Sequence, residues 1–298
     1  MENIYSNLSN INLSFISIPI PQSLLTLHQT SGIKRAVVTA CNSRYFRSCL
    51  TLITSLYKHS NTIIDKIYVF DLGLNDDEIG FLQRLSKVEC ITMDEILNYT
   101  HDIRTIFPDF LTPNQFAWKP YFIKHVFDFF KVQNVMWIDS GIVTFGSLKC
   151  VFKHIEKEGV WLTEETDWIN YNWTHPQCIN IMNATPTELQ ANQLIAGLTG
   201  FNINNEEAME VLNEWYTYST IKECVTGDHY ISISPSNNPL LKGHRHDQSI
   251  LAILRVRYNL PTVLKSPDLF EWRSLQDAIQ NNSLFYCHHG NYIDIDLK

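Results

Sequence analysis

Val135-Met136-Trp137-Ile138-Asp139-Ser140-Gly141 is the stretch around which this chain is organised. Four apolar residues run directly into an acid and a turn, which is the pattern of a strand buried on both faces of a sheet. Ligands of open α/β sheets bind beyond the carboxyl ends of the strands, so Asp139 is placed to meet a ligand or a metal. A plain turn, in which the carboxylate bonds its own backbone, is an equally good interpretation of these residues alone.

The composition is that of a globular protein. Of the 298 residues, 45% are apolar and 18% are charged, and the formal net charge is −8. Nucleic-acid binders are more often basic, so we expect no nucleic-acid partner. Seven cysteines without a C-x-x-C pair favour reduced thiols and a cytoplasmic location. No apolar run reaches transmembrane length, and residues 11–20 lack the basic flank of a signal peptide.

Residues 33–146 alternate between predicted strands and helices. Apolar runs predict strands at 36–40, 66–70 and 88–92, and amphipathic periodicity predicts helices between them. Asn75 and Glu78 form the capping box of the second helix. Another helix, with Pro120 in its first turn, leads into the central strand. This order is typical of a doubly wound parallel sheet.

The second half of the chain is less regular. Residues 98–117 and 163–193 show no clear period and are predicted to be irregular. Expected elements are a helix at 148–158, a strand at 159–162, a helix from Asn205 to Trp215, a helix around 250–254 and a strand at 284–287. We predict an N-terminal arm with a short helix at 1–32 and one domain at 33–298. That domain has a nucleotide-binding half at about 33–146 and an acceptor half at about 147–298.

Four stretches stand in an informative order, namely Val38-Thr39-Ala40-Cys41-Asn42-Ser43-Arg44-Tyr45, Trp118-Lys119-Pro120 leading into Trp137-Ile138-Asp139-Ser140-Gly141, Gly197-Leu198-Thr199-Gly200-Phe201-Asn202, and His246-Asp247-Gln248-Ser249-Ile250-Leu251. Their order and spacing resemble a GT-A glycosyltransferase of the glycogenin-like and lipooligosaccharide galactosyltransferase-like group. The resemblance covers roughly residues 34–292. It implies a single α/β domain of the GT-A (Rossmann-like) fold, with a mixed, mainly parallel central sheet flanked by helices.

The resemblance also implies a site for a nucleotide-diphosphate sugar, most often a UDP-sugar, and a glycan or other hydroxyl acceptor. The residues that match the donor site are Thr39, Ala40, Asn42, Arg44, Tyr45, Lys119, Asp139, Ser140, Gly141, Gly197 and Gly200. Asp247 and Gln248 match the catalytic segment and would position the reacting sugar in a retaining enzyme, the outcome that the resemblance favours. In an inverting enzyme, Asp247 would be the general base on the acceptor. Asp247 also suits the N-cap of the following helix.

The resemblance further implies Mn²⁺ or Mg²⁺ bound by Asp139 and a late histidine, His288 or His289. Two departures bear on this metal. Gly141 stands where the family's D-x-D motif has its second acid, and Cys287 has the spacing to Gly290 that the family's histidine has. Adjacent strand residues face opposite sides, so we expect one of the two histidines to face the site. Without a metal, Lys119 or Arg44 would have to meet the diphosphate.

Several alternatives stay open. The incomplete D-x-D motif suits a catalytically silent relative that binds a nucleotide sugar or glycan. A sugar nucleotidyltransferase is disfavoured, because the loop after the first strand has no glycine to cradle a triphosphate. Glu164 and Glu165 belong to an acid cluster that could serve a glycosidase or form a solvated loop. Trp161, Trp168 and Trp173 form either an acceptor platform or loop packing, and Arg245 either meets a phosphate or is surface charge.

Overall fold

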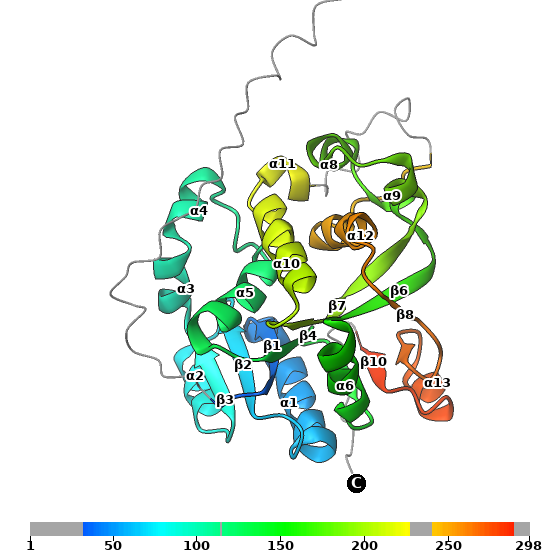
Figure 1. Cartoon of the computed structure of the whole chain (residues 1–298). Helices are drawn as coiled ribbons and strands as arrows, with labels where there is room; N and C mark the ends of the chain where they lie inside the picture. Colours follow the sequence, from blue (N-terminus) through cyan, green and yellow to red (C-terminus); the bar gives the residue numbers. More distant parts are fainter. Residues whose placement is uncertain (1–31, 114, 227–239, 289–298) are drawn as a thin grey trace, which may run out of the picture. The chain divides into compact units, whose positions relative to one another are not determined.

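A central sheet of seven strands organises the computed structural model, which describes residues 32–113, 115–226 and 240–288 (Figure 1). The strand order is β3-β2-β1-β4-β7-β6-β8. The strands span β1 Arg35–Cys41, β2 Lys66–Asp71, β3 Val88–Ile91, β4 Asn134–Ile138, β6 Val160–Ile169, β7 Asn192–Asn202 and β8 Val263–Leu264. The short helix predicted at 23–29 lies outside the described residues.

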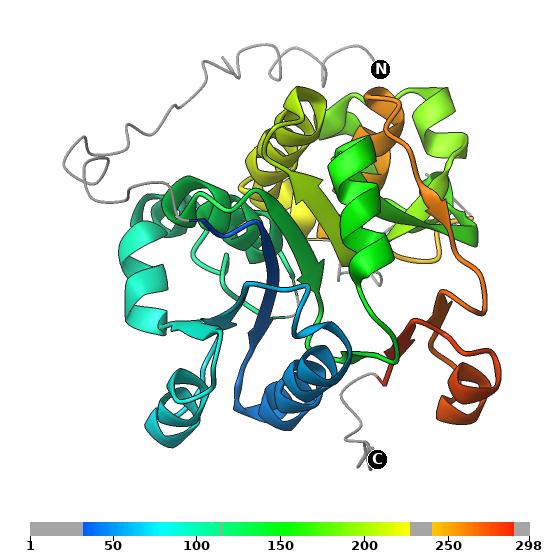
Figure 2. The same cartoon turned by 60° about the horizontal axis from the view of Figure 1, so that its bottom comes forward.

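The sheet is mixed and mainly parallel, as the sequence predicted. β1 pairs in parallel with β2 and β4, β2 with β3, and β6 with β8, whereas β7 runs antiparallel to both β4 and β6. A smaller sheet has the order β5-β10-β9, with β5 Ile142–Thr144, β9 Phe270–Glu271 and β10 Phe285–Cys287. This C-terminal region lies at the opposite end of the molecule from β3 (Figure 2).

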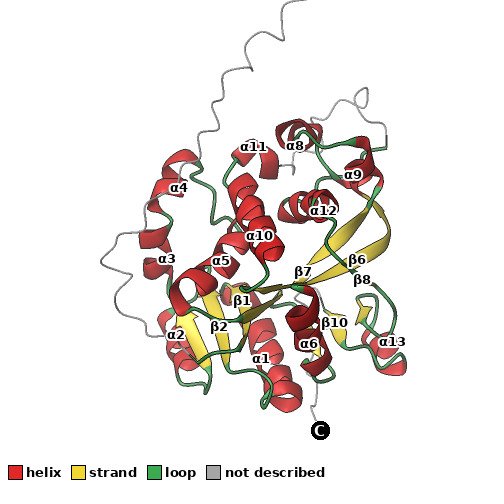
Figure 3. Ribbon diagram, viewed as in Figure 1, coloured by secondary structure: helices red, strands yellow, loops and turns green. Residues whose placement is uncertain are grey.

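Helices cover both faces of the sheet (Figure 3). Their bounds are α1 Phe46–Ser60, α2 Asp76–Gln83, α3 Met93–Tyr99, α4 His101–Ile106, α5 Trp118–Phe130, α6 Lys149–Glu158, α7 Asn170–Trp173, α8 Pro176–Met182, α9 Pro186–Gln190, α10 Glu206–Ser219, α11 Lys222–Val225, α12 Asp247–Arg257 and α13 Leu275–Gln280. The capping box of Asn75 and Glu78 at the start of α2 is confirmed. No described helix is long and apolar enough to cross a bilayer.

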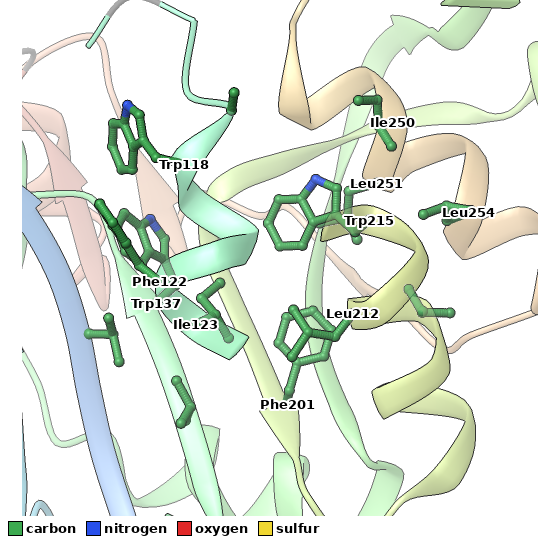
Figure 4. Packing of buried hydrophobic residues seen from close by; sticks show 14 of the residues in the cluster. Trp118, Phe122, Ile123, Trp137, Phe201, Leu212, Trp215, Ile250, Leu251 and Leu254 are labelled. Carbon is green, nitrogen blue, oxygen red and sulfur yellow. The ribbon is translucent and has the colours of Figure 1, made fainter. Parts of the chain in front are cut away.

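Period-2 alternation along β1 divides its side chains between two hydrophobic cores. Ala36, Val38 and Ala40 face the core beneath α5, α10 and α12, and Val37 and Cys41 face the core beneath α1 and α6. Figure 4 shows the first core, where side chains of three helices meet those of β4 and β7. The labelled residues are Trp118, Phe122, Ile123, Trp137, Phe201, Leu212, Trp215, Ile250, Leu251 and Leu254. Each such fully buried side chain contributes roughly 1.5–3 kcal/mol, which fixes α5 against β4 and α12 against β7.

Two regions predicted to be irregular contain short elements. In 98–117, the end of α3 and the whole of α4 lie between 98 and 106, and both helices are too short for their apolar period to be recognised. The described residues from 107 to 117 form no helix or strand, as predicted. In 163–193, β6 continues to Ile169 and three short helices, α7, α8 and α9, follow. Strand β7, which carries both glycines of the Leu194–Phe201 stretch, lies between β4 and β6. Each of these elements depends on distant partners rather than on local pattern.

Buried imidazoles hold the segment that leads into α12. His244 is fully buried, its Nε2 bonds the carbonyl of Cys224 at 2.9 Å, and its Nδ1 accepts from the backbone N–H of His175 at 3.1 Å. His246 Nδ1 bonds the carbonyl of Val225 at 2.8 Å. These contacts require a neutral His244, and burial, together with the neighbouring His246, lowers the pKa of His244 to about 3.

This depressed pKa makes stability pH-dependent. The unfolded chain protonates His244 below pH 6.5, but the folded chain does not, so stability that is present above pH 6.5 is lost as the pH falls. At pH 5 the loss due to His244 is about 2 kcal/mol. We expect the His244→Gln protein, compared by urea unfolding at pH 7 and pH 5, to lose about 2 kcal/mol less than the wild type.

The exposed His101 provides the matched control for this experiment. His101→Gln should show the same difference between pH 7 and pH 5 as the wild type. An equal loss of stability in the His244→Gln and wild-type proteins would contradict a neutral, buried His244.

Candidate functional site

Strand β4 delivers Asp139 to the carboxyl end of the sheet, as the sequence predicted. The backbone N–H of Asp139 donates to the Gly197 carbonyl at 3.0 Å, which continues the pairing of β4 with β7. Trp137 Nε1 donates to Asp139 Oδ1 at 2.6 Å. The side chain of Asp139 keeps 39% of its surface exposed, so this carboxylate is both fixed and accessible.

Lys119, in the first turn of α5, lies behind Asp139. Its side chain is 3% exposed, and its Nζ is 3.2 Å from Asp139 Oδ1 and 3.4 Å from Asp247 Oδ2. Nζ also donates to the Ala196 carbonyl at 3.3 Å. Burial alone would lower the pKa of Lys119, but the two carboxylates outweigh it and the net shift is upward. Lys119 is therefore a permanent buried cation.

Asp247 is the first residue of α12, and the N-cap position belongs to His246, so the expected capping role of Asp247 is wrong. Burial raises the pKa of Asp247 to about 6, although Lys119 opposes the shift. Oδ2 of Asp247 accepts no hydrogen bond from the described residues, beyond its ion pair with Lys119. Trp215 Nε1 donates to the Asp247 carbonyl at 2.9 Å, which fixes the start of the helix.

Gln248 reaches the pocket from the same turn of α12. Its Nε2 donates to Gln193 Oε1 at 3.2 Å, and its Oε1 accepts from the backbone N–H of Ala196 at 3.5 Å. Gln248 is thereby held against β7, beside the glycine at 197. An amide in this position can bond a ligand hydroxyl without adding charge.

A pocket of about 560 Å³ opens above Asp139, a volume typical of small-molecule sites. One part of its wall comes from the end of β1 and the following turn, and another from the second half of the chain. The described lining residues include Ala40, Asn42, Tyr45, Phe116, Asp139, Ser140, Gly141, Glu165, Trp168, Gly197, Arg245, Gln248, Trp272 and Cys287.

The predicted site residues therefore fall into three groups. Those that line the pocket are Ala40, Asn42, Tyr45, Asp139, Ser140, Gly141, Gly197 and Gln248. Lys119 and Asp247 lie beneath it, in contact with Asp139 or with each other. Thr39, Arg44 and Gly200 are not among the described lining residues. Thr39 is buried, and Arg44 is exposed beside the Tyr45 ring. A Cβ on Gly200 would meet Ile155 Cδ1 at 2.4 Å.

The two glycines of β7 make room for different neighbouring side chains. A Cβ on Gly197 would lie 2.8 Å from Asp139 Oδ2, so the absence of a side chain at 197 makes room for the carboxylate. A Cβ on Gly200 would press on Ile155 of α6 and on Trp161, within the second core. Gly197 belongs to the site and Gly200 to the packing of the sheet.

The metal expected at Asp139 has few ligands among the described residues. Gly141 offers no side chain, and its carbonyl accepts the backbone N–H of His288 at 2.9 Å. Pairing of β10 with β5 brings Cys287 to the pocket and buries His288 next to it, whereas His289 lies outside the described residues. Within 32–113, 115–226 and 240–288 no three His, Cys, Asp or Glu side chains form a metal-binding group. By themselves these residues do not complete a divalent-cation site.

The acid cluster lies within β6, and its contacts differ from both alternatives considered for it. Glu164 is buried and bonded by Arg255 and by Thr262 Oγ1, the latter at 2.7 Å. Glu165 pairs with Lys265 at 2.9 Å. Because both carboxylates are bound by basic side chains, they form neither a solvated loop nor a free glycosidase pair. Their partners come about ninety to a hundred residues later in the chain.

The pocket wall also holds residues that sequence reasoning missed or left undecided. Phe116 and Trp272 line it, and no local pattern marked either of them. Trp168 lines the pocket with Trp173 stacked against it, whereas Trp161 is buried in the second core and can form no platform. Arg245, two residues before Asp247, is part of the wall.

Comparisons with known proteins identify the family and the fold of this chain. The profile of Glycosyl transferase family 8 matches residues 36–241. The bifunctional glycosyltransferase WbbM is similar in structure, with a TM-score of 0.53 and 11% identity over 88% of this chain, which spans about half (47%) of WbbM. Mouse xyloside xylosyltransferase 1 has a TM-score of 0.52 and 8% identity, over 86% of this chain and 97% of its own.

The galactosyltransferase LgtC, solved with donor and acceptor sugar analogues, has a TM-score of 0.47 and 12% identity, over 86% of this chain and 87% of its own. No curated protein sequence matches this chain. The structural likenesses show the fold, and the predicted GT-A (Rossmann-like) fold is confirmed. The family match extends over most of the described sheet, including β4, Asp139 and both glycines of β7. This chain therefore belongs to glycosyl transferase family 8 and is a glycosyltransferase.

Proposed function

We propose that this glycosyltransferase moves a hexosyl or N-acetylhexosaminyl group from a UDP-sugar to a glycan or another hydroxyl acceptor. The observation that carries the proposal is a pocket lined both by Asn42 and Tyr45, from the nucleotide half, and by Asp139, Gly197 and Gln248. A nucleoside fits the end of β1, where Tyr45 can stack on a base. The reacting sugar then lies over Asp139 and Gln248, with the acceptor toward Trp272.

Retention of configuration is the stereochemical outcome that we propose. A general base must reach the acceptor hydroxyl directly or through one water. Asp247 is 2% exposed, lies beneath the pocket lining and is paired with Lys119, so it is poorly placed for that task. Its charge can instead steady positive charge that develops on the sugar above it. Gln248, which lines the pocket, would position that sugar.

The resemblance to the GT-A group implies a divalent metal at the donor site. We propose Mn²⁺ as the cofactor, held by Asp139 with His288 or His289. The free thiols of the described cysteines suit a cytoplasmic setting, which is our proposed location. Gly141 favours one alternative, a catalytically silent relative that binds the nucleotide sugar without turnover.

Thermal unfolding with UDP, GDP or CMP, each with Mn²⁺ or EDTA, tests the donor class. A ligand at about 100 times its dissociation constant adds roughly 2.7 kcal/mol to the stability of the native state. We expect UDP to raise Tm and GDP and CMP to leave it unchanged. A rise that needs Mn²⁺ would support a metal at Asp139, and a rise that survives EDTA would argue against that requirement. No rise with any nucleotide would contradict the proposed donor.

Turnover separates an enzyme from a silent relative. Wild-type protein should release UDP from a UDP-sugar, and Asp139→Asn should lower that rate by about 10²- to 10³-fold, as for loss of a preorganised electrostatic group. The fold should survive with some loss of stability, because Lys119 loses one carboxylate but keeps its ion pair with Asp247. Binding of UDP by wild-type protein with no release or transfer from any UDP-sugar would establish the silent alternative.

The two glycines of β7 give a matched pair of substitutions. Gly197→Ala places a methyl group 2.8 Å from Asp139 Oδ2, and a displaced carboxylate should lower kcat/KM by about 10²-fold with little loss of stability. Gly200→Ala presses on Ile155 and should lower stability by about 1–3 kcal/mol with activity near wild type. Urea unfolding and donor turnover measure both. Equal effects of the two changes on activity would show that Gly197 has no special relation to Asp139.

A further inference from the structure

Arg245 is the one Lys or Arg among the described residues that line the pocket. The two acidic side chains of that lining already have cationic partners: Asp139 lies 3.2 Å from Lys119, and Glu165 lies 2.9 Å from Lys265. Arg245 is exposed and forms no ion pair with a described acid. Its positive charge therefore remains available to a ligand in the pocket.

Arg245 is also held in place. Its guanidinium carbon lies 5.1 Å from the ring centroid of Trp168, and the Trp173 ring stacks against Trp168 with centroids 4.3 Å apart and planes inclined by 19°. The backbone N–H of Arg245 donates to the Trp173 carbonyl at 3.2 Å and to Ser249 Oγ at 3.1 Å. A cation stacked on an aromatic ring and anchored at its backbone loses little freedom on binding an anion.

A guanidinium binds phosphate oxygens through two parallel hydrogen bonds. Lys119, the other cation near Asp139, is 3% exposed and directed at two carboxylates, so it cannot take this role. We infer that Arg245 binds the diphosphate of the nucleotide-sugar donor, supplying from the pocket wall the positive charge that the donor requires. The inference rests on the proposed function. A carboxylate on an acidic acceptor would offer the same chemistry, and the experiment separates the two sources.

The test is calorimetric titration of wild-type and Arg245→Met proteins with UDP and with uridine. Methionine keeps an extended side chain over Trp168 but removes the charge. Loss of a charged hydrogen-bonding partner should weaken UDP binding by about 10- to 100-fold and leave uridine unaffected. Lys242→Met is the matched control, because Lys242 is exposed, three residues away and absent from the pocket lining. It should bind UDP as the wild type does.

Two results would overturn the inference directly. One is equal UDP affinity in the wild-type and Arg245→Met proteins, and the other is an equal loss for UDP and uridine, which would place Arg245 at the nucleoside. Glucuronate serves as the probe for an acidic acceptor. Weaker glucuronate binding by Arg245→Met with unchanged UDP binding would assign Arg245 to the acceptor and reject the diphosphate.

Inorganic pyrophosphate keeps this test separate from the proposed function. If wild-type protein binds neither UDP nor uridine, the proposed donor fails, but pyrophosphate still reports on Arg245. Tighter pyrophosphate binding by the wild type than by Arg245→Met would then support the anion site. Equal binding, or no binding, would overturn it.

Trp168 is a positioning residue that holds the Arg245 guanidinium. Trp168→Leu should weaken UDP binding by less than Arg245→Met does and leave uridine binding unchanged. In the Arg245→Met background the same change should have no further effect on UDP, because the two residues act as one unit. Additive losses in the double variant would show that Trp168 does not act through Arg245.

Discussion

The Lys119 ammonium, enclosed between Asp139 and Asp247, is the contact on which the site depends. An unpaired charge taken out of water costs several kcal/mol, so each of these groups requires the others. The three side chains come from α5, the end of β4 and the start of α12, elements far apart in the sequence. Their packing in one core places the charges, and the need to pair the charges in turn fixes how α5 and α12 approach β4.

The ion pairs of Lys119 beneath the pocket determine which charge the pocket wall must provide to a ligand. Asp139 presents a carboxylate whose charge is largely met by Lys119, and Gly197 leaves space for its second oxygen. The floor therefore offers no free cation, because the Lys119 ammonium is already paired with two carboxylates. An anionic ligand has to find positive charge elsewhere, and Arg245 on its tryptophan stack meets that need among the described lining residues.

The sequence predicted what local pattern controls. Continuous apolar runs placed β1, β2 and β4 within a residue or two, and the capping box of Asn75 located the start of α2. Contacts between residues far apart in the chain could not be predicted from local sequence pattern. Glu164 and Glu165 looked solvated because Arg255 and Lys265 follow so much later, and β7 was not recognised as a strand because its glycines are explained by neighbours on β4 and α6. The contact between Arg245 and Trp168 joins residues 77 positions apart, and sequence periodicity does not indicate contacts over that separation.

Gly141 shows why one motif position can change while the architecture stays intact. Its carbonyl accepts the N–H of His288, and this backbone bond, together with the pairing of β10 with β5, closes the small sheet beside Asp139. Backbone pairing does not depend on a side chain, so loss of an acid at 141 leaves the strands in place. Asp139 differs, because its removal would leave Lys119 short of a partner in the interior. Pairing with the buried Lys119 therefore requires an acid at position 139, whereas the backbone hydrogen bond at position 141 permits glycine.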